Sequence, residues 1–579
     1  MSQPVHMVFI NIIASLLLVA AVLFYRFVYP KKKINLFILL LFTAILPIIS
    51  VFRIGDYQSG DFNIHIYRMM SFFNSLKEGI LMPSWAADLN ATYGNPLFLF
   101  NYTLPYYIIC LLHLLGISFI TATKLYLGLV LYLSAIFMYF LAKETTNNKL
   151  AAFSSAIFYL FAPYHLIDVH FRATLGESTI FCITPLLFLF LAKYSKNNKL
   201  IYLTLVALLT YLLFLSHPLL AVVIIGICVL YVIFTGLLNK NIKSILNQLL
   251  SLFIGIVISA YIWGPFIIYS PYMFNYPTTN NVVFYPFNLL LYSPWRFGLL
   301  FQGPKGELAT VIGYTQLFVV LASIILLLAN KFSKKIKKQI MFWIILFLAT
   351  LFMMYPLSNI FWRYIPTVEV MLILYSRLSL ALALFTSIIA GFFVLHFETK
   401  KKLIYTLLIL TIGLTILNWG QRTLLPMVND NALRKNVPYS TLTEGPINYL
   451  DTIWADSKNP WFSKIPQNHL DILSGKGYVK ELSRTTTKHV YLISASTPLT
   501  IRENTLYFPG WQATSNDKII PIHPGYRGII SFNLSKGIQH VEVAYNDISL
   551  VYLLKVINAL GVSIMFVYLI FYLFKKYFT

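Results

Sequence analysis

Long apolar runs dominate this chain and constrain its fold more than any other feature. A helix needs about 20 consecutive, mostly apolar residues to cross the hydrocarbon core of a bilayer. Runs near that length begin close to residues 7, 35, 122, 150, 178, 200, 219, 247, 313, 340, 377, 403 and 550. The sequence therefore predicts an α-helical polytopic membrane protein with about 13 spans.

The composition excludes the main soluble classes. Hydrophobic residues make up 58% of the chain and charged residues 11%, whereas a soluble domain carries about 25% charged residues. A soluble enzyme, a disordered chain and a fibrous repeat are therefore excluded. The three cysteines, Cys110, Cys182 and Cys228, lie in apolar stretches, which favours neither a disulfide framework nor a zinc site.

The basic residues predict how the chain is oriented. Lys and Arg number 44 against 20 acidic residues, a net charge of +24. Because the basic residues form short clusters between apolar runs, they indicate membrane topology, and we predict no nucleic-acid partner. The run Leu104–Ser118 is too short to cross and is expected to be re-entrant or interfacial. All the clusters then fall on one side, at residues 31–33, 143–149, 193–199, 240–243, 331–338, 400–402 and 575–576.

The positive-inside rule makes that side cytoplasmic. We therefore expect a multi-pass protein of the inner (cell) membrane, with the N-terminus outside and the C-terminus in the cytoplasm. Met1 to His6 contains no basic residues, so we do not expect the first span to be a cleavable signal peptide.

Three regions follow from this topology. Residues 1–419 form a transmembrane helical module with outer loops at 53–121 and 271–312. Residues 420–548 form an extracytoplasmic β-rich domain, expected to be a β-sandwich. Residues 549–579 form a last transmembrane helix and a basic cytoplasmic tail. The strand patterns lie at 488–496, 498–508, 518–523, 527–533 and 538–545, separated by turn residues at 509–510, 516–517, 524–525 and 536–537.

The first outer loop holds the densest group of polar side chains. Asp61, His65 and Arg68 are spaced by four and three residues within a segment of helical character, so they share one helix face. A carboxylate, an imidazole and a guanidinium on one face could combine proton transfer with anion binding. The alternative is a solvated amphipathic helix that Asp61 merely caps.

Further polar groups lie where other spans reach the outer side. His165, Asp168, His170, Arg172 and Glu177 form one cluster, whose alternative explanation is interfacial anchoring with an Arg172–Glu177 ion pair. His217 could bind a ligand or be structural. Arg377 could bind a lipid phosphate or reach toward the interface. No nucleotide-binding loop, dinucleotide fingerprint or zinc-protease motif is present.

Several motifs of the chain together resemble a family signature. The elements are Asp61-x-x-x-His65-x-x-Arg68, Gly79, Pro83-Ser84-Trp85, Tyr93-Gly94-Asn95-Pro96, Tyr102-x-x-Pro105-Tyr106-Tyr107, Arg172-x-x-x-x-Glu177 and Phe508-Pro-Gly-Trp511. The pattern resembles that of bacterial polytopic membrane proteins described as "6-pyruvoyl-tetrahydropterin synthase-related" and of related membrane proteins that glycosylate cell-wall polymers. Tyr375-Ser-Arg377 departs from the P-W-R of that pattern, and Ala173 stands where glycine is usual.

Such proteins are similar to GT-C glycosyltransferases. This resemblance implies a GT-C-like fold and a polyprenyl-phosphate sugar as the donor substrate. Asp61 would act as general base and His65 would orient it or bind substrate, with a divalent metal at these two residues as an option. The enzyme, surrounded by membrane lipids, would transfer the sugar from this donor to an extracytoplasmic glycan or to a lipid-linked acceptor of the cell envelope. The expected substrate- and phosphate-binding residues are Arg68, Arg172, Glu177, His217 and Arg377.

Two other functions stay open at this point. A lipid-linked glycan flippase or transporter would need a continuous polar cavity through the bundle. A non-catalytic envelope scaffold would recruit partners through its β domain and would tolerate replacement of Asp61, Arg172 and Arg377. The sugar, the acceptor and the oligomeric state are not encoded in any motif of the chain.

Overall fold

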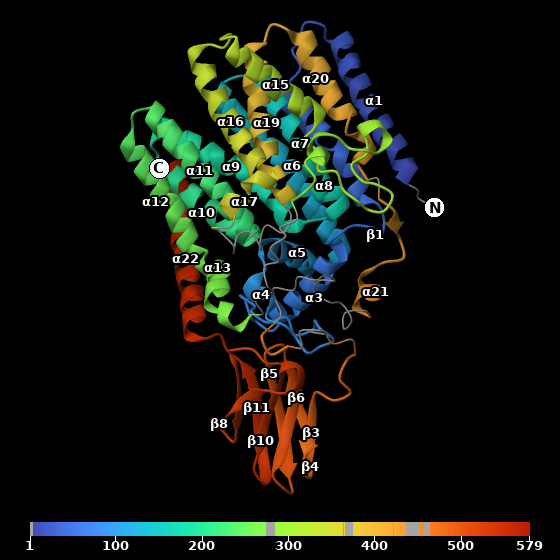
Figure 1. The fold of residues 1–579 in the computed structure, drawn as a ribbon, viewed down its shortest axis with the longest axis vertical. Helices are drawn as coiled ribbons and strands as arrows, with labels where there is room; N and C mark the ends of the chain where they lie inside the picture. Colours follow the sequence, from blue (N-terminus) through green and yellow to red (C-terminus); the bar gives the residue numbers. More distant parts are fainter. Residues whose placement is uncertain are drawn as a thin grey trace.

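The helices form one long bundle, and the β-strands form a separate layer at one end of it (Figure 1). The computed structural model describes residues 4–273, 284–362, 364, 375–420, 422–435, 452–455, 462 and 464–578. Parts of the expected outer loop 271–312 and of the expected β domain 420–548 therefore lie outside the described residues.

Eight helices of the described chain are long and apolar enough to cross a membrane. For α19 and α20 this length includes the 3-10 turn next to the helix. Their hydropathy agrees with the predicted membrane protein. The helices are α1 (Pro4–Val28), α6 (Phe119–Thr146), α9 (Leu175–Asn197), α11 (Pro218–Leu238), α16 (Lys334–Met353), α19 (Ser379–His396), α20 (Lys401–Gly413) and α22 (Ser549–Phe578).

Two bent pairs raise the number to ten. α7 (Lys149–Leu160) continues into α8 (Pro163–Ile167) across a 48° bend, and α12 (Ile242–Ile258) into α13 (Ala260–Ile268) across a 63° bend. Pro163 explains the first bend, because proline cannot donate the backbone hydrogen bond of a continuous helix.

The predicted count of about 13 spans depends on three shorter segments, and it stays a prediction. These are α2 (Leu36–Thr43) with the turn after it, α10 (Leu200–Ser216) and α15 (Tyr314–Leu328). The predicted interfacial segment forms α5 (Leu104–Leu114); its 11 residues would span roughly 16 Å, about half of the hydrocarbon core. The remaining short helices are α3 (Phe62–Lys77), α4 (Leu97–Phe100), α14 (Asn288–Leu291), α17 (Asn359–Trp362) and α21 (Asp430–Arg434).

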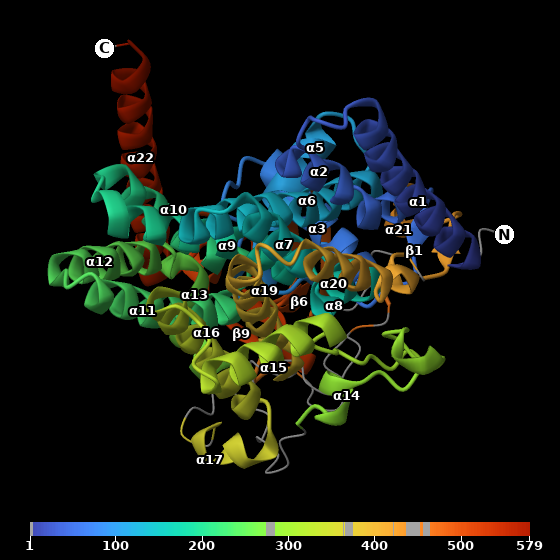
Figure 2. The ribbon, with the colours of Figure 1, turned by 90° about the horizontal axis from the view of Figure 1, so that it is seen from above.

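The bundle is layered around α19. In the membrane-length window of this helix 94% of residues are buried, against 11% in α1 and in α22. α19 packs on α7 and α16, and α6 packs on α7 and α9. Viewed along the bundle, α1 and α22 lie at opposite edges with α19 between them (Figure 2). The two peripheral helices therefore expose apolar faces of the kind that lipid covers.

Two antiparallel sheets make up the β region. One has the order β3-β6-β10-β9 and the other β4-β5-β11-β7-β8. Their facing side chains, among them Ile493, Ile501, Phe532 and Val541, are fully buried, as in a two-layer β structure. The strands are β3 (Leu470–Ser474), β4 (Gly477–Arg484), β5 (Lys488–Ala495), β6 (Leu499–Leu506), β7 (Trp511–Ser515), β8 (Lys518–Ile520), β9 (Ile522–Pro524), β10 (Ile529–Leu534) and β11 (Gly537–Tyr545).

The strand prediction was correct for β5, β6, β8, β9, β10 and β11 and missed β3, β4 and β7. β4 is exposed along nearly its whole length, so the alternation that reveals a half-buried strand is absent from it. The predicted turn at Asn516-Asp517 joins β7 to β8 with both residues at positive φ, as a two-residue hairpin requires.

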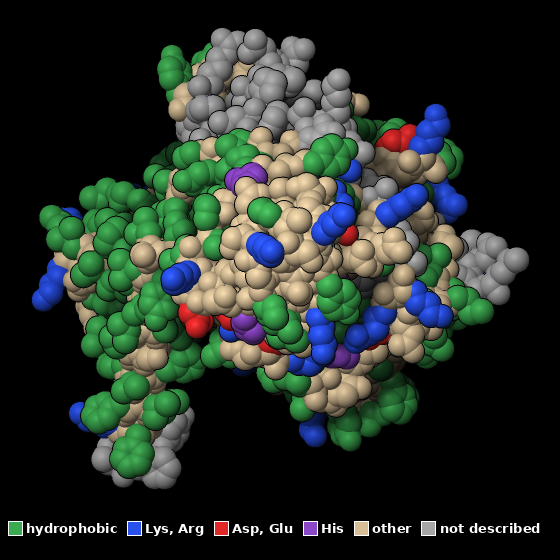
Figure 3. All heavy atoms as spheres, turned by 90° about the horizontal axis from the view of Figure 1, so that it is seen from below, with side chains coloured by type: hydrophobic (Ala, Val, Ile, Leu, Met, Phe, Trp, Pro, Cys, Tyr) green, Lys and Arg blue, Asp and Glu red, His purple; other side chains and the backbone are tan. Residues whose placement is uncertain are grey.

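The surface changes character between the two ends of the molecule. Seen from the β end, charged side chains lie over the sheets, while the flank of the helices is mostly apolar (Figure 3). The turns joining α1 to α2, α15 to α16 and α19 to α20, which carry basic clusters, lie at the opposite end of the bundle (Figure 1). A short pairing of β1 (Asp56–Tyr57) with β2 (Leu424–Leu425) ties the first outer loop to the segment after α20.

Candidate active site

The first outer loop docks on the turn between α8 and α9. The Asp61 N–H donates to the Arg172 carbonyl at 2.8 Å, and the Gly60 N–H donates to the Phe171 carbonyl at 3.0 Å. Asp168–Arg172 forms a single π-helical turn, which Ala173 ends in the left-handed region at φ 56°. This turn breaks the regular helix and brings Arg172 back beside the start of α9.

Glu177 is the centre of a buried ionic cluster. Its two carboxylate oxygens accept from Arg172 Nη1 at 3.0 Å and Arg172 Nη2 at 2.8 Å. The Tyr164 hydroxyl donates to the same carboxylate at 2.7 Å. Arg377 approaches it through Nε at 3.1 Å, and Arg172 Nη1 also reaches Asp168 at 2.9 Å. The Arg172–Glu177 ion pair, which the sequence analysis considered as part of the structural alternative for this cluster, is thus present, and it is bidentate.

Arg377 and Arg172 differ in the contacts that their guanidinium groups make. Arg172 is engaged by Asp168, Tyr164 and Glu177. Arg377 contacts Glu177 through Nε, and 20% of its side chain is exposed. Because the guanidinium approaches the carboxylate through Nε, it keeps two Nη groups that can donate to an anion in a fork geometry.

Asp61 is the N-cap residue of α3, and its carbonyl accepts from the His65 N–H at 3.0 Å. Its side chain makes no hydrogen bond to the first turn of the helix, so it is not a capping acceptor, although its charge lies at the N-terminal end of the helix, as in the structural alternative. The residue is partly exposed. Burial raises the pKa of the Asp61 carboxyl above its ordinary value, while the nearby Arg172 and Arg68 act in the opposite direction. Asp61 therefore lies within the electrostatic field of the Glu177 cluster.

His65 has different partners from those expected. Its Nδ1 lies 3.0 Å from the Tyr106 hydroxyl and its Nε2 lies 3.1 Å from the Tyr102 hydroxyl. Both ring nitrogens are thus engaged by tyrosines, and the expectation that His65 orients the Asp61 carboxylate is not met. Burial lowers the pKa of His65 well below its usual value, so the imidazole is neutral.

The same contacts argue against a metal at Asp61 and His65. A metal would need a free imidazole nitrogen, and taking one here would displace a tyrosine hydroxyl. In the part of the chain that the structure describes, no group of three or more His, Cys, Asp or Glu side chains could hold a metal ion. The residues present therefore do not fit the optional divalent ion.

His217 closes the site from α11. Its Nδ1 accepts from the Leu220 N–H at 3.4 Å, as a cap of this helix does. Its ring stacks on Tyr102 with centroids 5.8 Å apart. The structural role considered for His217 is therefore observed, and its position beside Tyr102 also places it at the edge of the cluster.

Sequence inspection identified the eight charged or imidazole residues described above for this region but missed its tyrosines. Tyr102 and Tyr106 belong to a motif of the first loop, and Tyr164 stands next to His165 in the second polar cluster. The position of Tyr102 and Tyr106 within that motif was the available signal. This signal did not single out the two residues, because the chain contains 39 tyrosines.

The other first-loop motifs do not reach this site and instead join the loop to the β-sheets. Trp85 packs edge-on against Trp511 and stacks on Tyr545, with centroids 5.3 and 5.7 Å apart. A Cβ at Gly94 would lie 2.4 Å from the Trp85 indole nitrogen. The Pro83-Ser84-Trp85, Tyr93-Gly94 and Phe508-to-Trp511 elements thus form a shared interface.

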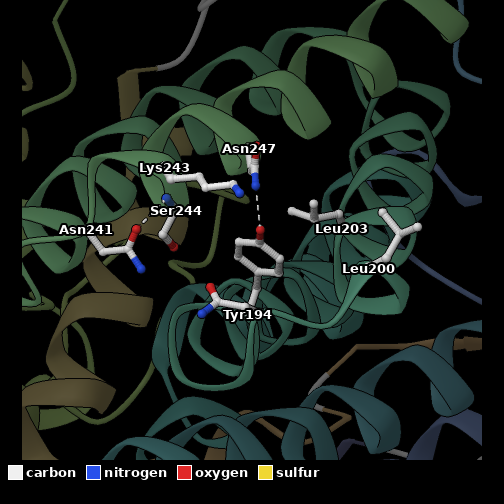
Figure 4. A pocket seen from close by; sticks show the side chains of 8 residues that line it. Tyr194, Leu200, Leu203, Asn241, Lys243, Ser244 and Asn247 are labelled. Atoms are coloured by element: carbon white, nitrogen blue, oxygen red, sulfur yellow. Dashed lines mark hydrogen bonds between the residues drawn. The ribbon is translucent and has the colours of Figure 1, made fainter.

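One cavity lies at the opposite end of the same helices. Its volume is about 380 Å³, and it is lined by Tyr194, Lys243, Ser244 and Asn247 among others, with Asn247 donating to the Tyr194 hydroxyl at 2.7 Å (Figure 4). Glu177 begins α9 and Tyr194 ends it, which separates the cavity from the ionic cluster by roughly 25 Å of helix.

Comparison with known proteins places the chain among membrane proteins. The sequence profile of the family described as "6-pyruvoyl-tetrahydropterin synthase related domain; membrane protein" matches residues 100–425. An uncharacterised protein of Lactococcus lactis subsp. cremoris is 27% identical over 246 residues, which cover 41% of this chain and 40% of that protein. The chain thus matches less than half the length of this relative.

One similar solved structure is the arabinofuranosyltransferase AftD from mycobacteria. The two chains are 12% identical with a TM-score of 0.44. The similar region covers 67% of this chain and 27% of the other.

Proposed function

We propose, from the premise that this chain belongs to the 6-pyruvoyl-tetrahydropterin synthase related family of membrane proteins, that it is a membrane glycosyltransferase. The proposed donor is a polyprenyl-phosphate sugar, and the proposed acceptor is an extracytoplasmic glycan or another cell-envelope molecule. The observation that carries the proposal is the position of Asp61, a partly exposed residue, beside two arginines that converge on Glu177.

This arrangement supplies the two groups that glycosyl transfer requires. A base must accept the proton of the attacking hydroxyl, and a fixed positive charge must stabilise the phosphate as it leaves. Asp61 is partly exposed, and Arg377 is the more exposed of the two arginines on Glu177, with 20% of its side chain exposed against 12% for Arg172. Glu177 is 2% exposed, which suits a supporting role that fixes the Arg377 guanidinium in place.

The proposed reaction is a direct displacement. The acceptor hydroxyl oxygen forms a bond to the anomeric carbon, and the bond between that carbon and the phosphate oxygen breaks. The hydroxyl proton passes to Asp61, and the polyprenyl phosphate departs with its charge facing Arg377, with Arg68 and His217 nearby. One base without a second carboxylate nucleophile predicts inversion at the anomeric carbon.

A membrane-rim location suits a lipid-linked donor. Glu177 and His217 lie at the ends of α9 and α11 that are remote from the basic turns at residues 193–199 and 240–243. If those turns are cytoplasmic, the site and the β-sheets face the extracytoplasmic side. The proposed topology accordingly has the N-terminus outside and the C-terminus inside, with residues 420–548 as a domain that binds the acceptor glycan.

The direct test uses purified protein in lipid nanodiscs with a panel of polyprenyl-phosphate sugars and envelope glycans. Wild-type protein should transfer label, and Asp61→Asn should lower the rate by about 10²–10⁴-fold, the usual contribution of a general base. Asp88→Asn is the matched control, because Asp88 lies in the same loop and accepts from Asn74 at 3.1 Å, away from the cluster. Full activity of a folded Asp61→Asn variant would exclude Asp61 as the base.

The flippase and scaffold alternatives give different outcomes in the same nanodiscs. A flippase would move a lipid-linked glycan across the bilayer without forming a new glycosidic bond. A scaffold would tolerate Asp61→Asn and Arg377→Gln together without loss of any activity measured in cells. Transfer of label by the wild-type protein would contradict both alternatives.

A further inference from the structure

The polar cavity at the far end of α9 lies beside two of the basic turns. The end of α9 and the starts of α10 and α12 surround it, and these three helices pack against one another. Its volume of about 380 Å³ falls within the range of small-molecule sites, about 300–1,000 Å³. Two of its eight lining residues are leucines, and the other six are Tyr194, Asn198, Asn241, Lys243, Ser244 and Asn247. The cavity is therefore large enough and polar enough to hold a ligand group.

The charge around the cavity is positive. Among the described residues that line it, Lys243 is the one charged residue. The two turns beside it, residues 193–199 and 240–243, carry five lysines and no acidic residue. One of these lysines, Lys196, pairs with Glu144 at 2.7 Å. The surroundings therefore favour an anion over a metal ion or an organic cation.

Two side chains of the lining have hydrogen atoms left to donate. Asn241 Oδ1 accepts from the Ser244 N–H at 2.9 Å (Figure 4), so the group that Asn241 has left is its amide nitrogen, which can only donate. The Ser244 hydroxyl accepts from Gln248 Nε2 at 3.0 Å. Within the described part of the chain this hydroxyl has no acceptor for its own proton, although Ser244 is only 3% exposed. A buried hydroxyl with an unused proton favours a ligand oxygen that accepts it.

Apolar side chains connect the cavity with the lipid-facing side of the helices. Leu200 lines the cavity and is itself exposed. On α12, Ile242, Leu246 and Leu250 follow one another every four residues and are each more than half exposed, so they form one apolar strip beside the residues that line the cavity. Acyl chains cover such a strip in a membrane. A polar cavity with an adjoining apolar surface fits an amphiphile better than a free ion.

We propose that this cavity binds the phosphate group of an anionic glycerophospholipid from the adjoining leaflet. The non-bridging oxygens of a phosphate only accept hydrogen bonds, which matches the donors that Asn241 and Ser244 have left. The Lys243 ammonium supplies the opposite charge, and the acyl chains lie along the apolar strip of α12. Basic pockets between membrane helices bind anionic headgroups in this way. The site is separate from the cluster at Glu177 and does not depend on the proposed transfer reaction.

The closing experiment measures lipid binding to the full chain with two matched pairs of variants. The protein in detergent is titrated with phosphatidylglycerol, and native mass spectrometry gives the affinity of the first bound lipid. Ser244→Ala removes the unused hydroxyl, and we expect it to weaken this affinity by roughly 3–10-fold. Ser259→Ala is its control, because Ser259 is also buried, lies at the far end of α12, and donates its hydroxyl to the Ile256 carbonyl at 2.8 Å.

The second pair tests the charge. Lys243 is the second residue of α12, and Lys335 is the second residue of α16, whose start is predicted to lie on the same side of the membrane. We expect Lys243→Gln to weaken the first phosphatidylglycerol by roughly 5-fold and Lys335→Gln to leave it unchanged. Equal losses in the two variants would show a diffuse attraction of the basic surface and would overturn the site.

Further outcomes decide between the sources of the phosphate. Excess inorganic phosphate should not displace phosphatidylglycerol, because it has no acyl chains; displacement would assign the cavity to a free anion and overturn the lipid. Phosphatidylcholine carries a compensating cation, so equal affinity for it would overturn the preference for an anionic headgroup. Unchanged affinity for phosphatidylglycerol in either Ser244→Ala or Lys243→Gln would overturn the proposed site itself.

Discussion

Arg172 and Glu177 form a bidentate ion pair in which both side chains are nearly buried. Nη1 and Nη2 of the arginine lie 3.0 and 2.8 Å from the two carboxylate oxygens, and the exposed fractions are 12% and 2%. The two residues are five positions apart along the chain, with Ala173 in the left-handed region between them. This local turn allows two groups at the ends of different helices to meet face to face.

Removing the carboxylate should destabilise the fold. Glu177→Gln leaves Arg172 and Arg377 without the anion that they share, and breaking a buried pair costs about 3–5 kcal/mol. We therefore expect a clear drop in the thermal unfolding midpoint in detergent. Glu144→Gln is the control, because the Glu144–Lys196 pair is more exposed, with exposed fractions of 24% and 53%, and surface pairs contribute about 0–1 kcal/mol. Equal effects of the two substitutions would show that the cluster does not support the fold.

The residue between the partners allows a second prediction. Ala173 is buried at φ 56°, a conformation that costs an L-residue roughly 1–2 kcal/mol, whereas losing its methyl group costs about 0.8 kcal/mol. Ala173→Gly should therefore leave stability unchanged or raise it slightly. Ala152→Gly, at an equally buried position inside α7, should destabilise by about 1 kcal/mol. Chemical denaturation of both variants measures the difference, and a larger loss at Ala173 would contradict the strain argument.

These residues also show how far the sequence alone could lead. The spacing of Asp61, His65 and Arg68 identified side chains that share one helix, because helix periodicity is local. Arg172 and Glu177 could be paired from their opposite charges and their closeness in the sequence, although a turn between two helices brings them together. The partners of His65 could not be predicted, since Tyr102 and Tyr106 are contributed by a separate segment. The span count depended on short apolar helices whose length falls near the limit for crossing a bilayer. β3 and β4 were missed because much of their surface faces outward.

The interface between the first loop and the β-sheets gives a third prediction. Gly94 has φ 76°, and a Cβ there would lie 2.4 Å from the Trp85 indole. Gly94→Ala should displace Trp85 from Trp511 and raise the hydrogen-exchange rates of β7. Gly116→Ala is the control, because Gly116 also has positive φ, 88°, but no atom within 4 Å of an added Cβ. It carries the backbone strain without the clash.

We expect the unfolding midpoint of Gly94→Ala to fall by several degrees more than that of Gly116→Ala, because overpacking typically adds 1–3 kcal/mol to the loss. Faster exchange in β7 that is confined to Gly94→Ala would assign the effect to the interface. Identical exchange in the two variants would show that Trp85 does not hold the sheets against the loop.

The pH dependence of transfer tests the electrostatic environment of Asp61. A general base works when deprotonated, so the rate should rise with pH as Asp61 loses its proton. Burial raises the pKa of Asp61, and the positive charge of Arg68 counteracts this. Arg68→Gln removes a charge that favours the carboxylate, so the pKa rises further and the acid limb of kcat/KM moves to higher pH. Lys77→Gln removes the same charge from the far end of α3 and should leave the limb in place. An unchanged acid limb in Arg68→Gln, or equal shifts in both variants, would show that the titrating base is not the carboxylate beside Arg68.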